Sequence, residues 1–132
     1  MSLGTILIVE DEPELQEILK DDLEYAGFKT VTQSNGLEAL EYLTKVQSNL
    51  ISIDAVISDI NMPQLTGLEL LKKLRENNIQ IPFVIYSGYS DEEKIQQAKS
   101  LGAFDVIEKP YDPHVLVQAM TKASELGRDR KK

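Results

Sequence analysis

The chain has 132 residues and a formal net charge of −8, from 22 acidic and 14 basic residues. It contains no cysteine, which excludes disulfides and cysteine-ligated metal sites, and no apolar run approaches the roughly 20 residues of a membrane span. The amino terminus lacks the basic and apolar regions of a signal peptide, so we expect one soluble, cytoplasmic domain.

The charge is unevenly distributed. Residues 128–132 hold four of the 14 basic residues and one of the 22 acidic residues, so the rest of the chain carries −11. An acidic body repels nucleic-acid phosphates and gains no affinity from counterion release. We therefore expect no direct nucleic-acid binding. The basic residues at the end are interpreted as a solvated helix end or the start of a linker.

The chain begins with a strand followed by a helix. Thr5–Val9 is an almost wholly apolar run, which predicts the first strand. Pro13 suits the first turn of a helix, where its missing N–H would be unpaired anyway, and Gly27 is a typical residue for a helix end. A short second strand is predicted over Phe28–Thr32.

The second helix and third strand follow the same alternation. Ser34 or Asn35 can cap the second helix, and residues 47–53 are expected to form a loop. The apolar run Ala55–Ile57 then predicts a strand buried on both faces, which ends at Asp59.

The second half of the chain repeats this pattern. Its predicted elements are a helix from Gly67, a strand over Phe83–Tyr86, a helix over Asp91–Leu101, a strand over Phe104–Glu108, and a helix that starts at Pro113 after the cap Asp112. Alternating strands and helices predict an α/β domain, a parallel sheet with helices on both faces. We place this domain at residues 5–124, followed by the basic residues 125–132. Residues 1–4 are interpreted as a short amino-terminal segment of the kind that an expression vector can supply.

Polar side chains follow four of the predicted strands. They are Glu10 and Asp11, Asp59, Ser87, and Lys109. Strand ends of a parallel sheet share one edge, so three carboxylates, a hydroxyl and an ammonium should converge there. Crowded carboxylates repel one another unless a cation lies among them. Mg²⁺ prefers such oxygen ligands, with Mn²⁺ as a substitute. A carboxylate beside Mg²⁺, lysine and a hydroxyl can attack phosphorus and form an acyl phosphate.

These motifs resemble the receiver domain of two-component response regulators, over residues from about Thr5 to Ala123. The matching segments are Glu10-Asp11-Glu12, Asp59-Ile60-Asn61-Met62-Pro63 with Gly67, Ser87-Gly88, and Lys109-Pro110. The resemblance implies a flavodoxin-like, doubly wound (βα)5 sandwich with strand order 2-1-3-4-5. It also implies that Asp59 is the phosphoacceptor of a bacterial signalling protein, which takes a phosphoryl group from a histidine kinase or a histidine phosphotransfer protein.

The resemblance also assigns roles to the other residues. Asp11, Asp59 and the backbone carbonyl of Asn61 would bind Mg²⁺ directly, and Glu10 would help through water. Gly67 would lie where the loop turns tightly. The phosphoryl oxygens would be held by three groups: Ser87, Lys109 and the N–H of Gly88.

One position departs from the family pattern. Many receivers have Tyr or Phe three residues before the lysine, where the ring turns inward on phosphorylation, and here that position is Val106. Phosphorylation chemistry is expected to survive this change. Switching by a ring at this position is not expected.

Partner surfaces are expected around the same site. The kinase should dock on the first helix and on the loop at Lys109-Pro110. Phosphorylation should alter the surface of the fourth helix, fifth strand and fifth helix, which could also form a homodimer. An effector domain could follow the chain at its carboxyl end.

Two other functions compete with this interpretation. A degenerate receiver would act only as a protein-docking module, although the full set of site residues argues against degeneracy. A magnesium phosphohydrolase with an Asp nucleophile would need a second Asp two residues later as its acid/base, and Asn61 stands there instead.

Overall fold

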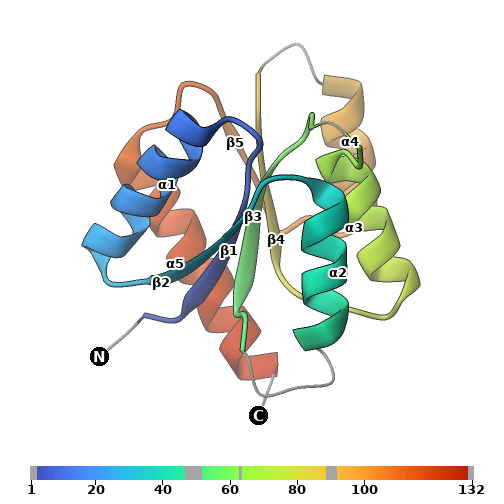
Figure 1. Cartoon of the computed structure of the whole chain (residues 1–132), viewed down its shortest axis with the longest axis horizontal. Coiled ribbons are helices and arrows are strands. Elements are labelled where there is room, and N and C mark those ends of the chain that lie inside the picture. Colours follow the sequence, from blue (N-terminus) through green and yellow to red (C-terminus); the bar gives the residue numbers. More distant parts are fainter. Residues whose placement is uncertain (1–2, 47–51, 63, 89–91, 131–132) are drawn as a thin grey trace.

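The structure is a computed structural model that describes residues 3–46, 52–62, 64–88 and 92–130 (Figure 1). Five strands form one parallel sheet in the order β2-β1-β3-β4-β5. The strands are β1 (Thr5–Val9), β2 (Lys29–Gln33), β3 (Ala55–Asp59), β4 (Phe83–Ser87) and β5 (Asp105–Glu108). This order confirms the flavodoxin-like fold expected from the sequence.

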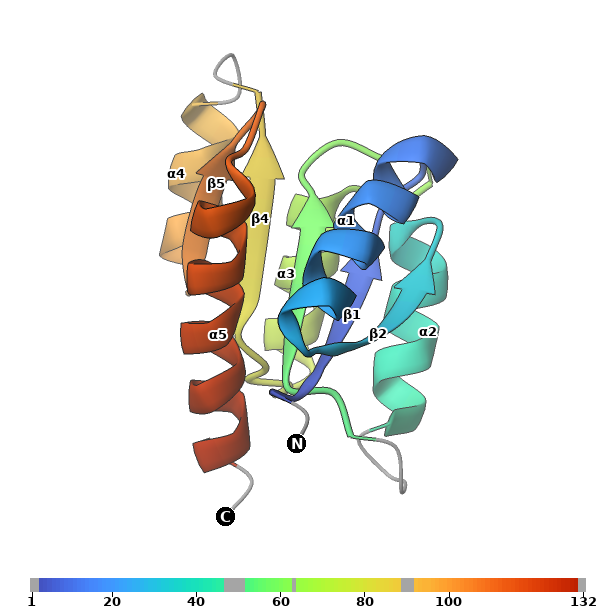
Figure 2. The same ribbon diagram turned by 90° about the vertical axis from the view of Figure 1, so that its left-hand side faces the viewer.

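Five helices alternate with the strands and cover both faces of the sheet. They are α1 (Pro13–Ala26), α2 (Gly36–Val46), α3 (Gly67–Glu76), α4 (Glu92–Ser100) and α5 (Pro113–Arg130). Helices α1 and α5 lie on one face, and α2, α3 and α4 lie on the other (Figures 1 and 2). Among the described residues, every helix is too short or too polar to cross a bilayer.

Alternation along the strands divides the core into two layers. Odd and even positions of a strand point to opposite faces, so each strand contributes to both layers. The layer under α1 and α5 contains Ile6, Ile8, Ala55, Ile57, Val84, Tyr86 and Ile107. The layer under α2, α3 and α4 contains Leu7, Val9, Val56, Phe83 and Ile85. The three central strands are therefore buried on both sides, as the continuous apolar runs indicate.

Most predicted elements are present, with small differences at their ends. The expected second strand begins one residue too early, because Phe28 belongs to the end of α1. Its N–H donates to the carbonyl oxygen of Leu23 at 3.1 Å, while Gly27 takes the left-handed conformation with φ 112°. This pair of features is typical of a helix that ends at glycine.

Asn35, and not Ser34, provides the side-chain cap seen at α2. The N–H of Glu38 donates to Oδ1 of Asn35 at 2.9 Å. The expected cap of α5 is also present, because the N–H of His114 donates to Oδ1 of Asp112 at 2.8 Å. Most of the expected loop at residues 47–53, and Asp91 at the expected start of α4, lie outside the described residues.

Candidate functional site

The charged site residues continue the apolar rows of the sheet face that α1 and α5 cover. On β3, Ala55 and Ile57 lie in that layer, and the next residue on the same side is Asp59. Likewise Glu10 follows Ile6 and Ile8, and Lys109 follows Ile107. The period of two that buries these strands therefore also aims two carboxylates and an ammonium to one side of the carboxyl edge.

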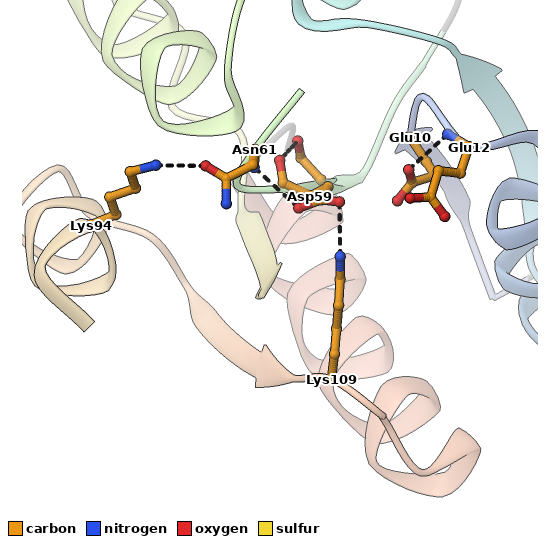
Figure 3. Close-up of polar contacts among 7 residues, drawn as sticks. Glu10, Glu12, Asp59, Asn61, Lys94 and Lys109 are labelled. Carbon is orange, nitrogen blue, oxygen red and sulfur yellow. Dashed lines mark hydrogen bonds and ion pairs between the residues drawn. The ribbon is translucent and has the colours of Figure 1, made fainter. Parts of the chain in front are cut away.

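Asp59 and Lys109 form an ion pair across the strand that separates them. Lys109 Nζ lies 2.9 Å from Asp59 Oδ2, although β4 stands between β3 and β5 (Figure 3). The Asp59 side chain is only 9% exposed, whereas that of Lys109 is 35% exposed. The carboxylate of Asp59 is thus largely shielded from solvent, whereas the ammonium of Lys109 belongs to a partly exposed side chain. The peptide bond between Lys109 and Pro110 is cis.

The second oxygen of Asp59 is held by the chain that follows it. The backbone N–H of Asn61 donates to Asp59 Oδ1 at 3.1 Å. Gly67 allows this loop to close, because a Cβ at Gly67 would overlap the backbone oxygen of Asp59, and its N–H donates to the carbonyl oxygen of Ile60 at 3.1 Å. A close approach of two backbones, and not a positive φ, is therefore why glycine is needed here.

Three carboxylates meet at this edge of the sheet. One carboxylate oxygen each from Glu10, Asp11 and Asp59 lies within 4.8 Å of the others. Glu10 is fully buried; its Oε2 accepts from the N–H of Glu12 at 2.9 Å, and its Oε1 is buried without a hydrogen-bond partner in the described structure. Burial, reinforced by the neighbouring carboxylates of Asp11 and Asp59, raises the pKa of Glu10 to about 8.

This donor set fits Mg²⁺. The three acidic side chains offer only oxygen atoms, which hard divalent cations prefer. Among the described residues, the buried Oε1 of Glu10 has no hydrogen-bond partner, and the carboxylates of Asp11 and Asp59 carry more charge than the single ammonium of Lys109 that pairs with Asp59. A bound cation would interact with the buried oxygen of Glu10 and balance the negative charge of the cluster. Of the residues predicted from the strand ends, Glu10, Asp11, Asp59 and Lys109 lie close together, and the three carboxylates among them are the ligands that the expected metal site requires.

Ser87 lies at the end of β4 on the opposite side of the sheet from Tyr86, in the row that contains Phe83 and Ile85. Its Oγ is buried and makes no hydrogen bond within the described part of the chain. Ser87 pairs in register with Glu108, and Ile85 pairs with Val106. Val106 therefore shares the face of Ser87 and is partly buried there. No atom of the described residues would lie within 4 Å of a Cβ at Gly88.

Two contacts at the site were not predicted from the sequence. Lys94 of α4 donates from Nζ to Oδ1 of Asn61 at 2.6 Å, and Lys109 Nζ lies 4.8 Å from the centre of the Tyr86 ring. Both depend on long side chains that reach between elements, which strand and helix periodicity does not describe. Strand order together with register could have indicated Tyr86, since it is the residue of β4 that pairs with Asp59.

Comparison with known proteins identifies the family. The model of the response regulator receiver domain matches residues 6–121. The chain belongs to this family. The sequence is 36% identical, over 112 residues, to the response regulator SaeR of Staphylococcus epidermidis, covering 85% of this chain and 46% of that protein. SaeR of Staphylococcus aureus is 33% identical with the same coverage. The receiver domain thus spans about half the length of these relatives.

Solved structures of receiver domains have the same fold. Full-length FixJ from B. japonicum matches with a TM-score of 0.86 and 28% identity, over 96% of this chain and 60% of that one. The chemotaxis protein CheY4 of Vibrio cholerae matches with a TM-score of 0.79 and 29% identity, over 91% of this chain and 98% of that one. The fold and family of this receiver domain therefore agree with the resemblance found in its sequence motifs.

Proposed function

We propose that this receiver domain accepts a phosphoryl group on Asp59 from a phosphohistidine of a histidine kinase or a histidine phosphotransfer protein. The observation that carries the proposal is the ion pair between Asp59 and Lys109, at 2.9 Å, inside a cluster of three carboxylates. A nearly buried carboxylate beside both an ammonium and a cation-binding cluster is suited to attack a charged phosphoryl group.

The chemistry follows from the groups at the site. One carboxylate oxygen of Asp59 forms a bond to phosphorus, the bond from phosphorus to the imidazole nitrogen breaks, and its electron pair leaves with the imidazole. The product is an acyl phosphate. Lys109 and the hydroxyl of Ser87 then hold phosphoryl oxygens, with the N–H of Gly88 beside them. Ser87 Oγ suits this role, because it has no other hydrogen-bond partner among the described residues.

The metal site belongs to the same proposal. Asp11, Asp59 and the backbone carbonyl of Asn61 would hold Mg²⁺ directly, and Glu10 would act through water; Mn²⁺ would be a substitute. When bound, the ion neutralises negative charge on the phosphoryl oxygens. Glu10 must be deprotonated to take part in the metal site. Its raised pKa means that the ion and a proton compete for this carboxylate.

Partner docking is proposed at α1 and the loop after Lys109. Tyr111 joins these two segments, since its hydroxyl donates to Oδ2 of Asp22 on α1 at 2.9 Å. Each of the helices α1 and α5 carries a large exposed apolar side chain in its first half: Ile18 of α1 is 52% exposed and Val115 of α5 is 49% exposed. Exposed apolar side chains on these helices are what a docking kinase or phosphotransfer protein would contact. We place this encounter in the cytoplasm.

Output is proposed to pass through α4, β5 and α5. Helix α4 buries only Ala98 fully among its described residues, so little apolar packing fixes it. Its first turn is tied to the loop after Asp59 by Lys94 and Asn61. A change at Asp59 could therefore shift α4 between two positions. This surface could serve a homodimer or an effector domain placed after the chain.

The competing functions have weaker support. In a phosphohydrolase, the residue two positions after the nucleophile would exchange protons, but Asn61 is an amide whose Oδ1 accepts from Lys94. A docking module would not need the Asp59–Lys109 pair or the carboxylate cluster, although it could keep both.

Intact mass after incubation with Mg²⁺ and acetyl phosphate tests the proposal. We expect one added phosphoryl group on the wild type, stable in acid and labile in base. The adduct should be absent from Asp59→Asn and when EDTA replaces Mg²⁺. An adduct of equal yield on Asp59→Asn would overturn the assignment of Asp59. No adduct from either acetyl phosphate or a phosphorylated histidine kinase would favour the docking module.

A further inference from the structure

Tyr86 lies directly under the path of the Lys109 side chain. Adjacent strands of a sheet are about 4.8 Å apart, so β3 and β5 are separated by roughly 10 Å with β4 between them. Lys109 follows β5 and reaches Asp59 on β3, and it must cross β4 to do so. The residue of β4 that pairs in register with Asp59 is Tyr86, whose side chain points to the same face.

The ring is well placed to hold the ammonium. Lys109 Nζ lies over the face of Tyr86, 4.8 Å from the ring centre, within the roughly 6 Å at which a cation is attracted to an aromatic face. Tyr86 is 1% exposed and packs in the layer under α1 and α5, so its ring is fixed by its neighbours. Lys109 is partly exposed and has a long flexible stem, which would otherwise sample many rotamers.

The hydroxyl of Tyr86 does not explain why this residue is present. Oη is buried and has no hydrogen-bond partner among the described residues. A buried, unpaired hydroxyl costs free energy, so phenylalanine would pack here at least as well. The part of Tyr86 that interacts with the site is therefore the aromatic face under Lys109.

We propose that Tyr86 is a positioning residue for phosphoryl transfer: its ring face supports Lys109 and keeps the ammonium aimed at the oxygens of Asp59. This inference rests on the proposed function, because it assigns the positioning of the lysine that would neutralise the incoming phosphoryl group. Holding that charge in place before the reaction lowers the reorganisation needed in the transition state. The ring contributes no metal ligand, so Mg²⁺ binding should not depend on it.

The test compares Tyr86→Leu, which removes the π face, with Tyr86→Phe, which keeps it and removes only the unpaired hydroxyl. Phe83→Leu is the matched structural control, since Phe83 is a fully buried aromatic of the same strand on the opposite face of the sheet. The rate of Asp59 phosphorylation by acetyl phosphate is measured at saturating Mg²⁺, together with Mg²⁺ affinity and the thermal midpoint.

We expect Tyr86→Leu to slow phosphorylation about fivefold, the size of a partly solvated cation–π contact of ~1 kcal/mol, while Mg²⁺ affinity stays within about twofold. Tyr86→Phe should restore the rate. Phe83→Leu should lower the thermal midpoint without this loss of rate. A rate for Tyr86→Leu equal to that of the wild type, or a loss that Tyr86→Phe fails to rescue, would overturn the inference.

A second measurement separates this inference from the proposed function. In the unphosphorylated protein, the ring current of Tyr86 should move the NMR signals of the Lys109 Hε protons upfield in the wild type and in Tyr86→Phe, and not in Tyr86→Leu. If the wild type takes no phosphoryl group, the proposed function fails, and these shifts alone decide whether Tyr86 positions Lys109. Identical shifts in all three proteins would contradict the contact itself.

Discussion

Lys94 of α4 donates a hydrogen bond to Oδ1 of Asn61, with 2.6 Å between the two atoms (Figure 3). Asn61 also donates its backbone N–H to Asp59. One residue therefore links the proposed phosphoacceptor to the first turn of α4. At the other end of this helix, Arg75 of α3 donates to the carbonyl oxygens of Leu101 and Gly102. Side-chain hydrogen bonds therefore hold helix α4 near both ends, and of these the Lys94–Asn61 bond is the one that leads to the site.

Replacing Lys94 should loosen the first turn of α4 and leave the rest of the fold unchanged. Lys94→Met keeps the apolar stem and removes the ammonium that bonds to Asn61. Because the contact is exposed, we expect global stability to change by less than about 0.5 kcal/mol, while amide exchange at residues 94–97 becomes several-fold faster. Lys99→Met is the control, since Lys99 is exposed on the last turn of the same helix. Equal exchange in both variants would show that the Lys94 contact does not restrain α4.

A methyl group at Gly67 should distort the loop that carries Asp59. Its Cβ would overlap the backbone oxygen of Asp59, and the hydrogen bond from Gly67 N–H to the carbonyl oxygen of Ile60 holds the two backbone segments in this close approach. We expect Gly67→Ala to lose about 2 kcal/mol or more of unfolding free energy, as in other overpacked sites. Urea unfolding measures this loss. Gly88→Ala, where a Cβ meets open space, should change stability by less than about 0.5 kcal/mol. Similar losses in the two variants would contradict the packing described at Gly67.

Glu10 should make the metal-free protein less stable as pH rises. Its pKa is about 8 in the folded protein and 4.5 when unperturbed, so between these values the folded state holds a proton that the unfolded state has lost. Stability from this group is complete below about pH 4.5 and is lost as pH rises through 8. In EDTA, we expect the wild type to lose on the order of 4 kcal/mol between pH 5 and 8.5 relative to Glu10→Gln.

Urea unfolding at a series of pH values measures the difference between the two proteins. Subtracting the profiles removes the contribution of other titrating groups. At saturating Mg²⁺, the difference in unfolding free energy between the two proteins should depend much less on pH, because the ion stabilises the ionised carboxylate. Parallel profiles in EDTA would show that burial does not raise the pKa of Glu10.

Strand geometry determines where Glu10, Asp59 and Lys109 lie, so the sequence predicts that these three residues converge. Each continues an apolar row of one sheet face to the end of a strand or just past it, so their common face and edge follow from periodicity. The layout of the fold follows from the same alternation of strands and helices. Element boundaries are predicted less accurately: the sequence places Phe28 at the start of a strand, but its N–H completes the end of α1.

Contacts that depend on side-chain reach were not predicted. Lys94 lies on the polar face of α4, where periodicity indicates only a solvated residue, and its bond to Asn61 depends on how closely α4 approaches the loop after β3. Tyr86 lies in the apolar run of the fourth strand, where periodicity indicates only a buried core residue, and it is buried there. Its second role arises only because β4 stands between Asp59 and the lysine that pairs with it.

The most direct test of the central claim is to locate the acyl phosphate. The wild type is phosphorylated with acetyl phosphate and Mg²⁺, reduced with borohydride, digested and sequenced by mass spectrometry. Borohydride converts the phosphorylated aspartate to homoserine, which marks the acceptor. We expect homoserine at position 59 alone, in proportion to the phosphoryl group first bound. Homoserine at position 11, or a phosphorylated protein with unmodified Asp59, would contradict the account.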